Sequence, residues 1–142
     1  MHIRTRMKHA SLALGTLIIA LAAGCGDDGG SGNAPDSIAG RSLSVQVTGG
    51  GAPFSSTGSY VFSATGDGKH GNYQLLGQGG VQSNNGVYSW SKTGDNTVFL
   101  LETEESGTLV QNTLTFNSPN SGTIHSSSSN VGGYEDGTFT LN

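Results

Sequence analysis

Hydrophobic and polar residues alternate along most of the chain after Arg41. Residues 42–47 read Ser-Leu-Ser-Val-Gln-Val, and residues 138–141 read Thr-Phe-Thr-Leu. This period of two is typical of a β-strand that buries one face and exposes the other. No window shows the 3.6-residue period of an amphipathic helix. The pattern therefore predicts an all-β domain.

Glycine-containing turns divide the alternating segments. A loose repeat of glycine, any residue and a large apolar residue begins at Gly58, Gly71, Gly86, Gly122 and Gly137. Glycine can supply the positive φ that many turns require. Strand spacings of about 10–15 residues with short turns favour an antiparallel meander. We expect about eight strands, near residues 41–48, 58–64, 71–77, 86–92, 96–103, 107–117, 121–128 and 136–141.

A closed or nearly closed small barrel with a filled interior is the preferred architecture, and a two-sheet β-sandwich is the alternative. Residues 98–101, Val-Phe-Leu-Leu, are apolar at successive positions, which is typical of a strand covered on both faces. We expect the core to contain large residues of the alternating segments, namely Phe62, Tyr88, Trp90, Leu100, Leu114, Phe116, Phe139 and Leu141.

The N-terminal part of the chain has a different pattern. Residues 1–8 are basic, and residues 10–23 are largely apolar but shorter than the roughly 20 residues of a membrane span. This arrangement fits a signal peptide. It ends in Leu-Ala-Ala-Gly-Cys at residues 21–25, which resembles the lipobox of bacterial lipoproteins. That family usually has leucine three residues before the cysteine, where this chain has Ala22.

The resemblance implies that residues 1–24 are removed and that Cys25, the only cysteine, carries lipid. In the family, glycine rather than aspartate after the cysteine favours the outer membrane over the inner one. Ordinary secretion with cleavage near Ala22 is the alternative, but it leaves Cys25 as an odd free thiol. Residues 25–38 lack an apolar period and are interpreted as a flexible tether, followed by one β-domain at 39–142.

The charge of the chain argues against nucleic-acid binding. Residues 25–142 contain all ten acidic residues but only Arg41, Lys69 and Lys92 as basic ones, so their formal charge is −7. Binding to a phosphate backbone requires clustered Lys or Arg. We therefore expect a membrane, through the lipid on Cys25, and an unknown protein or glycan as partners.

Several motifs suggest cofactors or metals, but turns or chance explain each of them. Matches to G-x-G-x-x-G at Gly24 and Gly66 lack the strand and helix that a dinucleotide site needs. Calcium ligands could come from Asp67, from residues 95–96 or from residues 135–136, yet none of these has several carboxylates spaced along one loop. We expect no cofactor and no metal.

The candidates for catalysis are equally sparse. Glu102 and Glu104 share one face of an extended chain, so a carboxylate pair is conceivable, but a solvated turn is the preferred interpretation. His70 and His125 have no zinc-site spacing, and no G-x-S-x-G elbow accompanies the many serines. We expect no catalytic residue and no enzymatic activity.

Aromatic residues offer another kind of site. Tyr and Trp present flat faces that could stack on a ligand or glycan, although burial is the default at alternating strand positions. The candidates for such contacts are Tyr60, Tyr73, Tyr88, Trp90 and Tyr134.

Residues 86–142 also resemble small Gly/Thr/Ser-rich β modules of bacterial surface proteins. The resemblance is carried by Gly-Val-Tyr-Ser-Trp at 86–90, Gly-Asp-Asn-Thr at 94–97, Thr-Leu-Thr-Phe-Asn-Ser at 113–118, Ser-Gly-Thr at 121–123 and Gly-Thr-Phe-Thr-Leu at 137–141. It implies no known activity. We expect a membrane-anchored binding or structural domain of the cell envelope. The alternative is a carrier of small apolar ligands, which requires a barrel interior that side chains do not fill.

Overall fold

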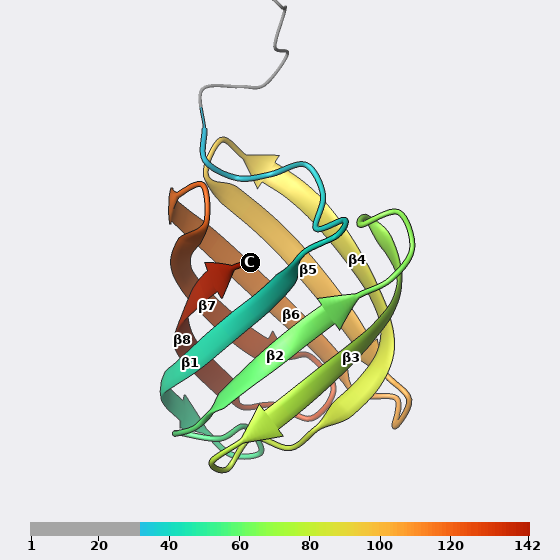
Figure 1. The fold of residues 1–142 in the computed structure, drawn as a ribbon. Helices are drawn as coiled ribbons and strands as arrows, with labels where there is room; N and C mark the ends of the chain where they lie inside the picture. The colour runs from blue at the N-terminus through green and yellow to red at the C-terminus, as the bar shows by residue number, and fades with distance from the viewer. Residues whose placement is uncertain (1–31) are drawn as a thin grey trace, which may run out of the picture.

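The computed structural model describes residues 32–142, which form one closed antiparallel barrel (Figure 1). Each strand pairs with its neighbour in sequence, and β1 closes the barrel against β8. The predicted meander and closed barrel are confirmed, whereas the sandwich is not formed. Residues 1–31, with the predicted signal peptide and Cys25, lie outside the described part. The strands are β1 (Ser42–Gly51), β2 (Ser59–Ala64), β3 (His70–Gln78), β4 (Asn84–Gly94), β5 (Thr97–Glu104), β6 (Leu109–Ser118), β7 (Ser121–Ser128) and β8 (Tyr134–Leu141).

The strands begin and end close to the predicted positions, with one instructive exception. β1 continues to Gly51 because Gly49, Gly50 and Gly51 pair with the first residues of β8. The register between β1 and β8 shifts between Val47 and Gly49. A run of glycines has no apolar alternation, so only the pairing partner reveals this extension of β1.

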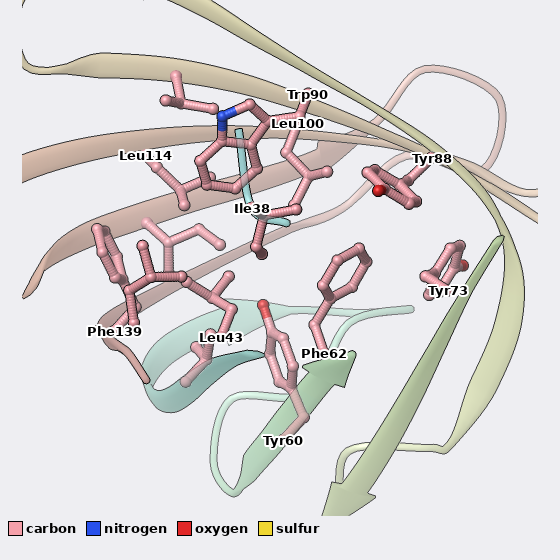
Figure 2. Packing of buried hydrophobic residues seen from close by; sticks show 14 of the residues in the cluster. Ile38, Leu43, Tyr60, Phe62, Tyr73, Tyr88, Trp90, Leu100, Leu114 and Phe139 are labelled. Carbon is pink, nitrogen blue, oxygen red and sulfur yellow. The ribbon is translucent and has the colours of Figure 1, made fainter. Parts of the chain in front are cut away.

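Alternation along each strand sends one set of side chains into the barrel. All eight residues predicted for the core are buried. The aromatic rings of the core pack in pairs: Phe62 stacks on the buried Tyr73 with centroids 5.0 Å apart, and Phe116 and Phe139 pack edge to face with centroids 4.8 Å apart. Gly122 leaves room for this packing, because an added Cβ would lie 2.9 Å from the Phe139 ring. Figure 2 shows the cluster from close by.

Residues 32–41 cross one end of the barrel and close it, and we call this the capped end (Figure 1). Ile38 is fully buried in the middle of the hydrophobic cluster (Figure 2), and Ala34 is also buried. The Ile38 amide donates a hydrogen bond to the Gly68 carbonyl at 3.0 Å, and the indole nitrogen of Trp90 donates one to the Pro35 carbonyl at 3.1 Å. The described part of the predicted 25–38 tether is therefore a packed part of the barrel, and the domain boundary expected at residue 39 is wrong. Two isolated apolar residues among polar ones have no detectable period, which is why the sequence did not indicate the cap.

The strand β5 also corrects an expectation. Val98 and Leu100 point inward and are buried, but Phe99 and Leu101 point outward and are only half-buried. Within residues 32–142 the barrel is a single closed sheet, so β5 is not covered on both faces. The described residues also contain no helix with the length and apolar character needed to cross a membrane.

Candidate ligand-binding cavity

The end of the barrel opposite the cap contains a cavity of about 460 Å³. Small-molecule sites usually measure about 300–1,000 Å³. We call this end of the barrel the open end. Residues from all four connections at the open end contribute to the wall of the cavity. These connections comprise residues 52–58, 79–83, 105–108 and 129–133.

The cavity exists because the inward side chains change character along the strands. Towards the capped end, β6 and β7 place Leu114, Phe116 and Ile124 inside the barrel. Two positions further towards the open end, the same inward face carries Asn112 on β6 and Ser126 on β7. These smaller polar side chains leave the open end less filled than the aromatic half. The predicted filled interior is therefore correct for only one half of the barrel.

Strand parity also places carboxylates inside. On β5, Leu100 points inward, so Glu102 lies on the same face and is buried with only 4% of its surface exposed. On β8, Phe139 points inward, so Glu135 does as well, and it is 6% exposed. Both residues line the cavity, together with the half-buried Glu104. The solvated turn expected for Glu102 is wrong, because β5 continues through Glu104.

A chain of hydrogen bonds holds three of the polar side chains in place. Ser126 donates to the amide oxygen of Asn112 at 2.6 Å. The Asn112 amide nitrogen donates to Glu102 at 2.8 Å and to the Leu100 carbonyl at 3.1 Å. Asn112 and Ser126 are direct partners across β6 and β7, which explains their close approach. This network fixes the position of the Glu102 carboxyl group.

The Glu135 carboxyl group is different, because no hydrogen bond from residues 32–142 reaches it. Glu135 lies directly opposite Ser126 across β7 and β8, on the same level as the network, and lines the cavity. Asn84 also lines the cavity; its amide nitrogen donates to Glu104 at 3.3 Å, while its buried amide oxygen has no donor among the described residues. The cavity wall therefore presents hydrogen-bond acceptors that the described residues leave unused.

The lining also has an apolar part. Leu75 on β3, Val110 on β6 and Val81 in the connection after β3 contribute aliphatic side chains, and Tyr60 on β2 adds an aromatic one. Small-molecule sites likewise combine apolar side chains with polar groups that orient the ligand.

Burial raises the pKa values of the inward residues Glu102, Glu135 and Tyr60. Removal from water raises the pKa of Glu102 to about 8; the hydrogen bond from Asn112 opposes this rise, and the charges of Glu104 and Glu135 add to it. Burial also raises the pKa of Glu135 to about 7. The pKa of Tyr60 is raised by burial and then by the nearby Glu102 and Glu135.

No basic side chain of the described residues offsets these carboxylates. Arg41 precedes β1 and Lys69 lies in the turn before β3, both at the capped end. Lys92, near the end of β4, is 3.8 Å from Asp36 of the cap. His70 and His125 are largely exposed on the outside of the barrel. The cavity is therefore an acidic environment without an internal counter-charge.

The aromatic residues proposed for ligand contacts do not form one exposed platform. Tyr60, Tyr73, Tyr88 and Trp90 are buried inside the barrel, whereas Tyr134 is 47% exposed outside it. Only Tyr60 of this group lines the cavity. The alternation that predicts their burial also explains why they cannot share an outer face.

The other candidate sites are explained by local structure. Asp67 accepts hydrogen bonds from the backbone amides of Lys69 and His70 at 2.8 and 2.7 Å, which lower its pKa and stabilise the turn. Glu135 and Asp136 point to opposite faces of β8, and Asp136 contacts His125 at 2.6 Å on the outside. Across residues 32–142, no three acidic, histidine or cysteine side chains gather closely enough to hold a metal ion.

Sequence reasoning missed Asn112, Ser126 and Glu135 as members of one site. The sequence did contain a signal for each of them. Each is a polar residue that lies on the same face of its strand as the apolar residues of that strand. Only the register between β6, β7 and β8 shows that the three lie side by side. The chain matches no family model, and no curated protein or solved structure is significantly similar to it.

Proposed function

We propose that this chain is a non-enzymatic binding protein that holds a small molecule in the cavity at the open end of its barrel. The observation that carries the proposal is the uneven filling of the interior. One half is packed by aromatic and aliphatic side chains, whereas the other half contains a 460 Å³ cavity with buried carboxyl groups.

A purely structural role accounts poorly for these carboxyl groups. Burial of an unpaired carboxyl group opposes folding, and an apolar residue of similar size would avoid that cost. Glu135 nevertheless faces the cavity and has no hydrogen-bond partner among residues 32–142. A ligand that contacts Glu135 would compensate for this burial, and we therefore favour binding over a structural role.

The cavity does not contain an activated serine nucleophile among its described residues. Ser126 is the most buried serine of the cavity wall, and its hydroxyl group donates to the amide oxygen of Asn112. An amide oxygen is not a general base, so this contact does not activate Ser126 as a nucleophile.

A lipid anchor on Cys25 would orient the cavity relative to the membrane. Only eight residues lie between Cys25 and Ala34, which is packed at the capped end. An extended chain of that length spans at most about 30 Å. In a protein anchored at Cys25, the capped end would therefore remain near the membrane. The cavity at the opposite end would open to the aqueous side of the envelope.

A cavity-filling variant tests the binding role. The neutral fluorescent probe 1-N-phenylnaphthylamine should bind protein expressed from the full-length chain and gain fluorescence. Val110→Trp, which places a large ring in the cavity, should abolish that gain. The matched control is Val87→Trp, because Val87 points outward and is 51% exposed. The proposal fails if Val110→Trp retains a native β circular dichroism spectrum and binds the probe as the control does. Val81→Trp at the cavity entrance provides a second variant if Val110→Trp does not fold.

A further inference from the structure

We infer that the ligand of this cavity is an organic amine, whose protonated nitrogen contacts Glu135 and Glu102 and whose apolar part packs against Leu75 and Val81. The inference rests on the proposed binding function and specifies the chemical class of the ligand. It is carried by three observations, which concern the unpaired carboxyl group, the charge of the cavity and the apolar wall.

The first observation is the state of Glu135. This residue is 6% exposed and lines the cavity, and its carboxyl group faces the cavity space without a hydrogen bond from the described residues. Asn84, which lines the cavity from β4, also presents a buried amide oxygen without a donor among the described residues, while its amide nitrogen donates to Glu104. An ammonium group has three N–H donors and no acceptor, which matches a wall of unused acceptors.

The second observation is the absence of positive charge in the described part of the cavity. Glu102, Glu104 and Glu135 line it, while no Lys, Arg or His does. A carboxylate or phosphate ligand would place a further negative charge beside these residues once they are ionised, with no basic side chain in the lining to offset it. Fatty acids and other anions are therefore disfavoured where these carboxyl groups are ionised.

The third observation separates an organic cation from a metal ion. Calcium requires six to eight oxygen ligands around one point. The acidic side chains of residues 32–142 do not converge in that way. The cavity wall also carries Leu75, Val81 and Val110, whose aliphatic surfaces suit the hydrocarbon part of an amine.

Binding of an amine should release protons. Burial raises the pKa values of Glu135 and Glu102 to about 7 and about 8, so both groups are partly protonated near neutral pH. An ammonium ion favours their ionised forms. The affinity should therefore rise between pH 6 and pH 8.5, where a primary alkylamine keeps its proton. The titratable groups that face these two carboxyl groups are Glu104 on β5, Tyr60 on β2 and Tyr73 on β3, and both tyrosines stay neutral because their pKa values are raised.

Three probes with the same carbon chain test the inference. Hexylamine, hexan-1-ol and hexanoate are titrated into protein expressed from the full-length chain, and displacement of 1-N-phenylnaphthylamine is measured at pH 8. Hexylamine should bind at least about tenfold more tightly than the alcohol or the carboxylate, because only it forms a buried charge pair. Calcium chloride serves as a fourth probe and should displace nothing.

Matched variants identify the groups involved. Glu135→Gln keeps the shape of the side chain but removes its charge, and it should weaken hexylamine at least about tenfold while leaving hexan-1-ol within about twofold. Glu102→Gln should act in the same direction. Glu105→Gln, in the exposed turn after β5, is the control and should change neither affinity.

The outcomes distinguish this inference from the binding function itself. If hexan-1-ol or hexanoate binds as tightly as hexylamine and Val110→Trp abolishes that binding, the cavity binds ligands but the amine assignment is wrong. Displacement by calcium, or unchanged hexylamine affinity in Glu135→Gln, would likewise overturn the amine assignment. If neither the fluorescent probe nor hexylamine binds, both proposals fail.

Discussion

Ile38 inserts its side chain into the barrel while its backbone amide donates a hydrogen bond to the Gly68 carbonyl in the turn between β2 and β3. A residue from the segment before β1 thus completes the core at the capped end. The barrel consequently depends on a side chain that belongs to none of its strands.

Replacement of Ile38 should therefore destabilise the whole barrel. Ile38→Ala removes a fully buried side chain, and such truncations cost about 2–5 kcal/mol. Chemical denaturation measures the change in the free energy of unfolding. Val87→Ala, at an exposed position on β4, should cost far less. Equal effects of the two substitutions would show that the cap does not contribute to stability.

The raised pKa of Glu102 predicts that the barrel becomes less stable as the pH rises. In the unfolded chain this carboxyl group ionises near its ordinary pKa of 4.5, whereas in the barrel it keeps its proton up to about pH 8. Between these values the folded state binds more protons, so the free energy of unfolding decreases as pH rises. Above pH 8 both states are ionised and this contribution no longer changes.

Glu102→Gln should remove the Glu102 part of this pH dependence. Each unit by which a pKa is raised corresponds to about 1.4 kcal/mol, so the difference is measurable in melting curves from pH 5 to pH 8. The variant should lose less stability over this range than the wild type. A smaller decline should persist because burial also raises the pKa of Glu135. Glu105→Gln should decline like the wild type, and a parallel decline of Glu102→Gln would contradict the assignment.

The last strand should be indispensable. β8 pairs with β1 on one side and β7 on the other, and its Phe139 side chain is buried. Phe139→Ala should cost about 3–5 kcal/mol, and deletion of residues 137–142 should unfold the barrel. Circular dichroism and thermal melting measure both effects. Thr138→Ala, at an exposed position of the same strand, is the control. A truncated chain that melts like the intact one would be incompatible with the closed barrel.

The lipid anchor remains a prediction that labelling can test. Cys25 is the only cysteine of the chain, so Cys25→Ser removes the only thiol that can accept lipid. Cells grown with labelled fatty acid should transfer the label to the wild-type protein and not to the variant. Ala22→Leu, which restores the usual leucine of the lipobox, should keep the label. Equal labelling of the Cys25→Ser protein would refute the anchor.

Period-two alternation was sufficient to predict the all-β class, the meander, most strand bounds and the eight core residues. Alternation works here because an extended chain places successive side chains on opposite faces, so Phe139 and Leu141 necessarily point the same way. The same alternation places Glu102 and Glu135 on the inward faces of β5 and β8. Charge alone, however, made an exposed turn the preferred interpretation of Glu102.

Tertiary structure decided which inward-facing residues of different strands lie next to one another. Closure brings β8 beside β1, and the register across β6, β7 and β8 aligns Asn112, Ser126 and Glu135 on one level of the wall. The position of Ile38 under the cap likewise depends on contacts between segments distant in sequence. These relationships are set by long-range packing and strand register, whereas the sequence pattern records only the local choice between inside and outside. The sequence by itself therefore determined an all-β meander with an apolar inner face, and only the three-dimensional arrangement closed it into a barrel with an acidic cavity in one half.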